Sequence, residues 1–126
     1  YLTNSVNMLY YKGKQKGGNM STVWLIDIDG TVCDDIPNET PELFATAKPI
    51  PGSLEKVKEL YENGDRVTFF TARTDEHAEA TEAWLDKHDF PYESVCYNKP
   101  RINDGETYHW ADNRSVLATF VPEGLK

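Results

Sequence analysis

Short apolar runs alternate with segments of helical periodicity along this chain. The runs are rich in β-branched and aromatic residues, which is typical of strands, and they cover residues 23–26, 66–70, 94–97 and 107–111. Between them, residues 54–62 and 75–88 place apolar side chains on one side of a helix. Strands that alternate with helices pair in parallel through right-handed crossovers. We therefore predict an α/β fold with a central, mostly parallel sheet.

Cap and turn residues set the ends of these elements. Ser53 is predicted to cap the first helix, which Asn63-Gly64 ends, and Thr74 is predicted to cap the second. Residues 32–50 contain prolines and no clear period, so they are expected to form a long loop. Residues 116–120 fit a short helix or a last strand equally well.

Length and composition indicate one globular domain. The chain has 126 residues, of which 39% are hydrophobic and 27% charged, and this suffices for a single core. No apolar run approaches the roughly 20 residues that cross a bilayer, so we expect no membrane partner. Cys33 and Cys96 form no Cys-x-x-Cys pattern. They are expected to be free thiols of a cytoplasmic protein, although the sequence leaves a disulfide open.

Charge is unevenly distributed between two parts of the chain. The net charge is −8, yet residues 1–20 carry lysines and no acid. We interpret residues 1–20 as a flexible or non-native N-terminal segment and residues 21–126 as the folded domain. Because an acidic domain repels polyanions, we expect no extended nucleic-acid binding. A small phosphorylated substrate drawn to a local cation remains compatible with this charge.

The first apolar run leads directly into Asp27-Ile28-Asp29-Gly30-Thr31. Ligands bind at the carboxyl ends of parallel strands, and two carboxylates are costly to hold close together unless a cation or a proton transfer requires them. An acidic turn is the simpler interpretation of Asp-x-Asp-Gly alone. A calcium-binding EF-hand loop is rejected because its last position, a Glu in such loops, would be Asn38.

Three later strand ends carry further polar groups, Thr71, Lys99 and Asp112. Parallel strands bring their carboxyl ends to one edge of the sheet, so these groups are expected to converge on the first two acids. Such a set suits phosphoryl transfer. A carboxylate attacks phosphorus to form an aspartyl-phosphate, Mg²⁺ bound by carboxylates reduces charge repulsion, and a hydroxyl and an ammonium group bind the phosphoryl oxygens.

Residues 23–114 resemble the phosphatases of the haloacid dehalogenase (HAD) superfamily. The similarity implies a three-layer, Rossmann-like sandwich around a central, mostly parallel sheet. Four motifs carry it in order: Asp27-Ile28-Asp29-Gly30-Thr31, the strand end Val67–Thr71 with Ala72-Arg73, Lys99-Pro100, and the strand end Tyr108–Ala111 with Asp112-Asn113.

The resemblance implies a role for each motif residue. Asp27 would be the nucleophile and a magnesium ligand. Asp29 would be the general acid and then the general base, with its backbone carbonyl on the metal. Asp112 would complete the protein ligands of Mg²⁺. Thr71 would hydrogen-bond the phosphoryl group, and Lys99 would neutralise this group while orienting the nucleophile.

Several assignments have simpler explanations. Thr71 also suits a strand end, Lys99 a solvated basic loop, and Asp112 a helix cap. Ala72 and Arg73 are added as substrate-binding residues, with Arg73 a candidate for a second anionic group of the substrate. Asn113 departs from the motif, which ends in two acids, and lowers the expected metal affinity.

Neither gap between the motifs has room for a cap domain, so we predict a small, capless member. An open site suits a bulky substrate, or a homo-oligomer in which a neighbour covers the site. We favour a phosphorylated sugar or glycan intermediate, hydrolysed as a phosphate monoester. The alternatives are a nucleotide or nucleic-acid-end phosphatase, and a catalytically weak domain that binds a phosphorylated ligand.

Overall fold

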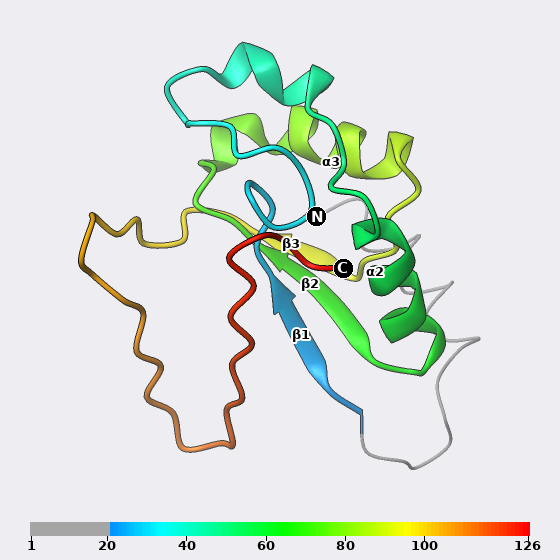
Figure 1. The fold of residues 1–126 in the computed structure, drawn as a ribbon, viewed down its shortest axis with the longest axis vertical. Helices are drawn as coiled ribbons and strands as arrows, with labels where there is room; N and C mark the ends of the chain where they lie inside the picture. Colours follow the sequence, from blue (N-terminus) through cyan, green and yellow to red (C-terminus); the bar gives the residue numbers. More distant parts are fainter. Residues whose placement is uncertain (1–20) are drawn as a thin grey trace.

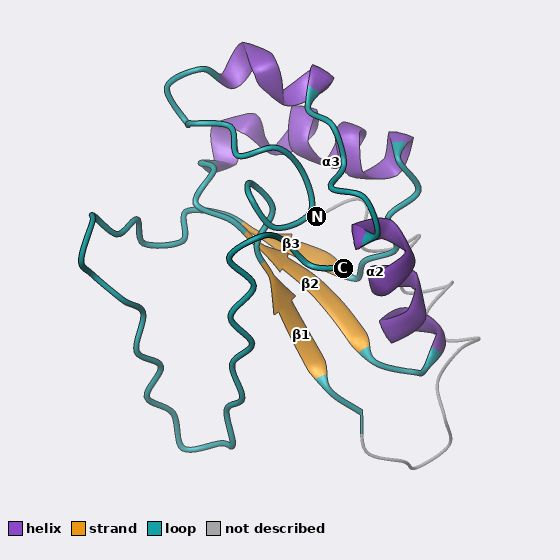
Figure 2. Ribbon diagram, viewed as in Figure 1, coloured by secondary structure: helices purple, strands orange, loops and turns teal. Residues whose placement is uncertain are grey.

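A computed structural model describes residues 21–126, and its centre is a parallel sheet (Figures 1 and 2). The strands are β1 (Val23–Ile26), β2 (Arg66–Phe70) and β3 (Ser94–Cys96), ordered β1-β2-β3. Both pairings are parallel, which confirms the predicted α/β class. The segment of residues 1–20, predicted to be flexible or non-native, lies outside the described residues.

Helices connect successive strands. The 3₁₀ helix η1 (Pro41–Thr46) and helix α2 (Ser53–Glu62) lie between β1 and β2. The 3₁₀ turn η2 (Asp75–His77) and helix α3 (Ala78–Lys87) lie between β2 and β3. Among residues 21–126, these two connections contain no further domain.

The predicted cap of the first helix is wrong, and that of the second is correct in position only. Gly52, with φ of 90°, is the N-cap of α2, and Ser53 is its first helical residue. The Ser53 hydroxyl donates to the Val32 carbonyl oxygen at 3.1 Å instead of capping the helix. Thr74 occupies the N-cap position of η2, which leads directly into α3. Its hydroxyl donates to Glu76 Oε1 at 3.0 Å, so it does not cap the backbone.

The core lies between the helices and the face of the sheet to which every second strand residue points. Phe69 of β2 is fully buried and meets the rings of Phe90 and Tyr92 edge to face, with centroids 6.0 and 5.8 Å away. Trp84 of α3 is 2% exposed and stacks on Phe90 at 5.6 Å. The opposite face of β1 carries Leu25, which is 44% exposed. Among residues 21–126, the helices therefore cover one face of the sheet.

The fourth predicted strand, residues 107–111, does not form. Residues 101–120 are exposed throughout and belong to an extended loop (orange to red in Figure 1). Residues 116–120, predicted as a helix or a strand, are part of the same loop. Strand propensity reflects packing against neighbouring strands, and β1 pairs with β2 alone in the described sheet. In the part of the chain that is described, no helix has the length and apolar character to span a membrane.

Because Phe69 makes the aromatic contacts of β2, truncating its side chain is predicted to destabilise the protein strongly. We expect Phe69→Ala to lower the free energy of unfolding by about 3–5 kcal/mol, because it removes a fully buried ring and leaves a cavity. Urea denaturation measures this change. Leu117→Ala, at a position 88% exposed in the loop, is the control and should stay within about 0.5 kcal/mol of the parent. Equal effects of the two substitutions would contradict this description of the core.

Candidate active site

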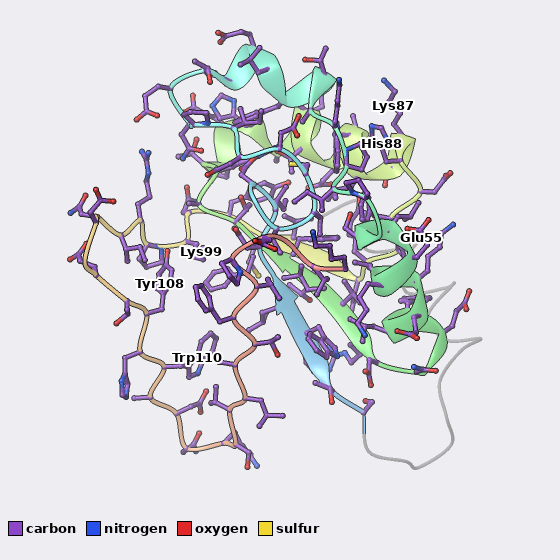
Figure 3. The ribbon with its side chains drawn as sticks, in the orientation of Figure 1. Glu55, Lys87, His88, Lys99, Tyr108 and Trp110 are labelled. Atoms are coloured by element: carbon purple, nitrogen blue, oxygen red, sulfur yellow. The ribbon has the colours of Figure 1, made fainter. Side chains whose placement is uncertain are left out.

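The carboxyl ends of β2 and β3 are tied together by backbone hydrogen bonds. The Thr71 amide donates to the Cys96 carbonyl oxygen at 2.9 Å, and the Lys99 amide donates to the Thr71 carbonyl oxygen at 2.9 Å. Asn98, between them, adopts a φ of 64°, which turns the chain after β3. Lys99 therefore leaves the sheet beside the end of β2 (Figure 3).

Asp27 lies at the end of β1 between two donors. Lys99 Nζ donates to Asp27 Oδ1 at 3.0 Å, and Thr31 Oγ1 donates to Asp27 Oδ2 at 3.0 Å. The Asp27 side chain is 35% exposed and that of Lys99 is 14% exposed. The carboxylate is thus oriented and paired with a cation while one side remains open to an incoming molecule.

Asp29 is held differently, by a two-pronged ion pair with Arg73. Arg73 Nε donates to Asp29 Oδ2 at 2.9 Å and the second nitrogen, NH2, donates to Oδ1 at 2.7 Å. Such fork-to-carboxylate pairs fix both distance and orientation. The predicted neighbours Asp27 and Asp29 therefore each have their own cation.

Arg73 is fully buried, so it does not face the solvent as a substrate-contacting residue would. Its remaining nitrogen donates to Thr81 Oγ1 of α3 at 3.0 Å. The Phe44 ring of η1 covers the guanidinium, with the centroid 3.8 Å from the central carbon. The partner of its charge is Asp29, an anion of the protein. Arg73 was predicted to contact a second anionic group of the substrate. In this packing it contacts Asp29 instead.

Thr71 and Ala72 lie where the motif predicts, at the end of β2. Thr71 is 1% exposed, and its Oγ1 accepts a hydrogen bond from the Arg73 amide at 3.1 Å. The hydroxyl proton of Thr71 remains able to donate. The Ala72 carbonyl oxygen accepts a hydrogen bond from Asn38 Nδ2 at 2.8 Å, which holds the loop after β1 against this edge.

Asp112 does not join the other two acids. It lies in the exposed loop, where it accepts hydrogen bonds from Trp110 Nε1 and from the Arg114 amide, both at 3.1 Å. The hydrogen bond from Trp110, followed by that from the backbone of Arg114, lowers the pKa of the Asp112 carboxyl. Residues 21–126 contain no group of three Asp, Glu, His or Cys side chains able to hold a metal. The predicted three-acid magnesium site is therefore not assembled in this arrangement.

Cys33 adds a thiol beside Asp29. It is fully buried, whereas Cys96 is exposed, and both are free. Burial, together with the neighbouring negative charge of Asp29, raises the pKa of the Cys33 thiol to about 12. The thiol therefore stays protonated and acts as a weak donor to Asp29 Oδ1 at 3.7 Å.

Three contacts around the site were missed by sequence reasoning. Thr31, whose hydroxyl donates to Asp27, belongs to the first motif and follows the acid by four residues. Thr81 lies on the buried side of α3, where a hydroxyl signals a polar partner. Phe44 gave no signal, because the loop that carries it showed no period.

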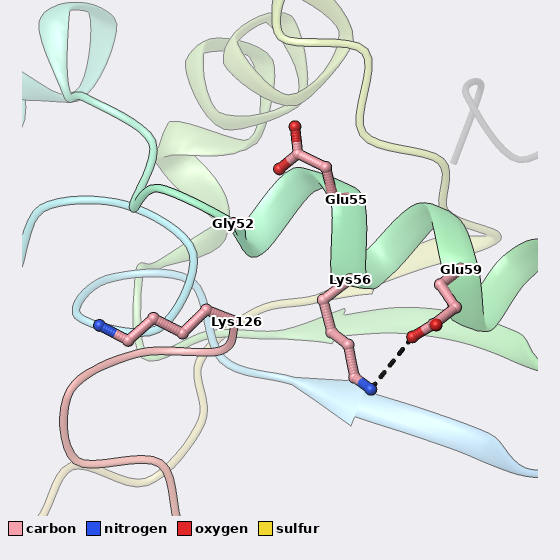
Figure 4. A pocket seen from close by; sticks show the side chains of 5 residues that line it. All are labelled: Gly52, Glu55, Lys56, Glu59 and Lys126. Atoms are coloured by element: carbon pink, nitrogen blue, oxygen red, sulfur yellow. Dashed lines mark hydrogen bonds and ion pairs between the residues drawn. The ribbon is translucent and has the colours of Figure 1, made fainter.

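A separate hollow of about 320 Å³ lies on the surface near the start of α2 (Figure 4). Its lining includes none of the predicted site residues and consists of Gly52, Glu55, Lys56, Glu59 and Lys126. It is open, and the Lys56–Glu59 ion pair at 3.2 Å on its wall is solvent-exposed. The candidate site therefore remains the edge formed by the strand ends.

Comparisons with known proteins identify the family of this chain. The sequence model of a protein family described as "HAD superfamily, subfamily IIIB (Acid phosphatase)" matches residues 2–108. A crystal structure of a protein from Vibrio cholerae is similar over 75% of this chain and 82% of that chain, with a TM-score of 0.57 and 23% identity. The similarity to this crystal structure supports the Rossmann-like fold.

Two relatives carry the names of nucleotidases. A protein of Oceanobacillus iheyensis named "Putative nucleotidase" is 45% identical over 95 residues, which are 68% of this chain and 50% of that protein. A protein of Chlorobaculum tepidum named "Putative 5'(3')-deoxyribonucleotidase" is 29% identical over 90 residues, which are 67% of this chain and 45% of that protein. The chain thus spans about half the length of these relatives.

The unequal burial of the two ion pairs predicts unequal effects of removing each acid. Asp29→Asn should lower the free energy of unfolding by about 3–5 kcal/mol, because it leaves the buried Arg73 cation without its anion. Asp27→Asn should cost about 1 kcal/mol or less, since Asp27 and Lys99 both reach solvent. Urea denaturation of the two variants makes the comparison. A larger loss for Asp27→Asn would contradict it.

The two thiols should differ in reactivity. In the native protein at mildly alkaline pH, iodoacetamide should modify Cys96 and leave Cys33 unmodified, because the Cys33 thiol is buried and keeps its proton. Peptide mass spectrometry locates the label. In Cys96→Ser the native protein should stay unlabelled and take up label only after unfolding. Native labelling of Cys33 at the rate of Cys96 would disprove its burial.

Proposed function

We propose that this chain, which belongs to the HAD superfamily, subfamily IIIB, hydrolyses phosphate monoesters with Asp27 as its nucleophile. The observation that carries the proposal is the carboxylate of Asp27, oriented by Lys99 and Thr31 at the edge where the three strands end. Each carboxylate oxygen has more than one lone pair. An oxygen of Asp27 therefore retains a lone pair for attack while it accepts its hydrogen bond.

The reaction would proceed in two steps. In the first, an Asp27 oxygen attacks phosphorus, the bond between phosphorus and the ester oxygen breaks, and the leaving oxygen takes a proton. In the second, water attacks the phosphorus of the aspartyl-phosphate, loses a proton, and releases inorganic phosphate and free Asp27. Asp29 is the group proposed to give the first proton and to take the second.

The ion pair between Asp29 and Arg73 affects how Asp29 can donate and accept a proton. In the described arrangement both oxygens of Asp29 accept hydrogen bonds from Arg73, which suits the second step, where a carboxylate removes a proton from water. In the first step, the proton would have to lie on an Asp29 oxygen that also faces the leaving group. The packing of Arg73 against Thr81 and Phe44 supports a fixed orientation of this carboxyl group.

Lys99 and Thr71 would bind the transferred group. Lys99 is close enough to Asp27 to contact a phosphoryl group placed on that carboxylate, and its charge would offset the negative charge of the phosphoryl oxygens. The Thr71 hydroxyl proton is available as a further donor. Neither residue changes its covalent state in this scheme.

Mg²⁺ is proposed as the cofactor, with Asp27 as its carboxylate ligand. Proteins often bind Mg²⁺ through one or two carboxylates together with water and substrate phosphate, and the exposed side of Asp27 fits this mode. When bound, the ion would reduce the repulsion between the carboxylate and the phosphate. The proposed contribution of Asp112 requires the loop of residues 101–120 to take another position, so no step is assigned to it.

Nucleoside monophosphates are the substrate class we propose, in place of the sugar phosphates favoured by the sequence alone. The names of the relatives from Oceanobacillus iheyensis and Chlorobaculum tepidum support this choice. The net charge of −8 also favours a small substrate over a polymer with many phosphates.

A binding domain of low catalytic power is the second candidate. The position of Asp112 away from Asp27 and Asp29 favours it, because a site without its third acid holds a divalent ion weakly. Asn113, which carries no charge, acts in the same direction. Such a domain would bind a phosphorylated ligand without turning it over.

Activity measurements separate the two candidates. Hydrolysis of nucleoside 5′-monophosphates should require Mg²⁺, stop on chelation, and fall by several orders of magnitude in Asp27→Asn. Released phosphate is the readout. Asp75→Asn changes an exposed carboxyl group outside the site and is the matched control, which should retain activity. Hydrolysis that survives in Asp27→Asn would refute the nucleophile, and ligand binding without turnover would favour the second candidate.

A further inference from the structure

The buried Arg73 is held by side chains of two helical elements as well as by Asp29. Phe44, in η1, places its ring on the guanidinium, with the ring centroid 3.8 Å from the central carbon. Thr81, in α3, accepts a hydrogen bond from Arg73 NH1 at 3.0 Å. Phe44, Arg73 and Thr81 are all fully buried. We call Phe44 and Thr81 the arginine clamp.

Phe44 is itself fixed by neighbouring elements. Its ring meets the His77 imidazole of η2 edge to face, with centroids 5.5 Å apart and planes at 80°. Trp84 Nε1 of α3 donates to the carbonyl oxygen of Ala47, directly after η1, at 2.9 Å. These contacts hold η1 (cyan in Figure 1) beside α3. The loop after β1 therefore supplies one side of the surroundings of the guanidinium.

The arginine clamp determines which way the donors of Arg73 point. A guanidinium is planar and its donors have fixed directions. With a ring on one face and an acceptor at NH1, the remaining donors Nε and NH2 are directed at Asp29. The buried ring also excludes water from the face that it covers, and contacts between a cation and a ring are stronger when desolvated. The orientation of the Asp29 carboxyl group thus depends on residues of η1 and α3.

We propose that Phe44 and Thr81 are positioning residues, which act through Arg73 to aim the Asp29 carboxyl group at the leaving oxygen. This inference rests on the proposed function, in which Asp29 gives that oxygen a proton, and it adds the residues on which the transfer depends. A proton donor must lie within hydrogen-bond reach of its acceptor, so geometry limits the transfer first. Loosening the arginine clamp should therefore slow the step in which the ester bond breaks and the proton passes to the ester oxygen.

Two substrates separate this proton transfer from the rest of the reaction. 4-Nitrophenyl phosphate releases a stable phenolate that departs without a proton, whereas a nucleoside 5′-monophosphate releases an alcohol that needs one. The ratio kcat/KM covers only the steps up to this departure. Phe44→Ala and Thr81→Val should each lower kcat/KM for the nucleotide by about tenfold or more, out of the roughly 10²–10⁴-fold contribution of a general acid, and change that for the aryl ester by less than about twofold.

Conservative and distant substitutions are the controls. Thr81→Ser keeps the hydroxyl that Arg73 NH1 needs and should restore most of the nucleotide hydrolysis. Leu43→Ala, at a position of η1 that is 45% exposed, should change neither substrate. Val57→Ala truncates a fully buried side chain of α2, so it lowers stability but should keep the ratio of the two kcat/KM values. Equal losses for both substrates in Phe44→Ala and Thr81→Val, no loss for either, or no rescue by Thr81→Ser would overturn the inference while phosphate hydrolysis stands.

A measurement without turnover tests the arginine clamp if neither substrate is hydrolysed, in which case the proposed function alone fails. In the parent protein, the Arg73 Nε proton should exchange slowly with solvent, because it is buried and bonded to Asp29. NMR of isotope-labelled protein should show exchange faster by about tenfold or more in Phe44→Ala and Thr81→Val, and unchanged in Leu43→Ala. Fast exchange in the parent protein, or rates that the first two substitutions leave unchanged, would overturn the positioning of Asp29 through Arg73.

Discussion

Two carboxylates separated by one residue can lie at the same strand end because each is paired with its own cation. Asp27 is paired with Lys99, and Asp29 with Arg73. Like charges this close disfavour the ionised form of both groups unless opposite charges offset them. The cations lie just beyond the carboxyl ends of β2 and β3, so the site depends on the parallel order β1-β2-β3. Without that order, neither acid would have its partner.

The two ion pairs differ in burial, and this difference divides their roles. Arg73 has no exposed surface, and its position is fixed by Asp29, Thr81 and the Phe44 ring. Lys99 keeps some exposure and faces the open side of Asp27. The first pair therefore joins the elements η1 and α3 to the strand ends, whereas the second is accessible to an anionic ligand. Within one motif, the ion pair of Asp29 thus contributes mainly to stability, and Asp27 carries the proposed nucleophilic attack.

The sequence predicted the sheet and the first three motif positions because these depend on local patterns. The runs that became β1, β2 and β3 carry apolar residues bounded by turn signals, and parallel pairing then fixes where Asp27, Thr71 and Lys99 lie. The role of Arg73 could not be predicted in this way, because a buried cation and a substrate-binding cation look alike in sequence. Its partner Thr81 lies on another element, and only tertiary packing brings the two together.

The fourth motif shows the limit of strand propensity. Residues 107–111 have the composition of a strand, yet the described fold gives them no neighbouring strand to pair with. Their aromatic residues then remain at the surface, and Asp112 bonds to Trp110 instead of meeting the other acids. A propensity is realised only where a partner is present, and the sequence of the segment itself does not contain that partner.

Chemical trapping of the phosphorylated side chain tests the central claim, that Asp27 is the nucleophile, most directly. Acid quenching during turnover of a nucleoside monophosphate, followed by borohydride reduction, converts an aspartyl-phosphate into homoserine. Peptide sequencing by mass spectrometry should find homoserine at position 27 and at no other aspartate. Homoserine at another position, or turnover that leaves Asp27 unmodified under conditions that trap the intermediate in a known aspartyl-phosphate enzyme, would contradict the account.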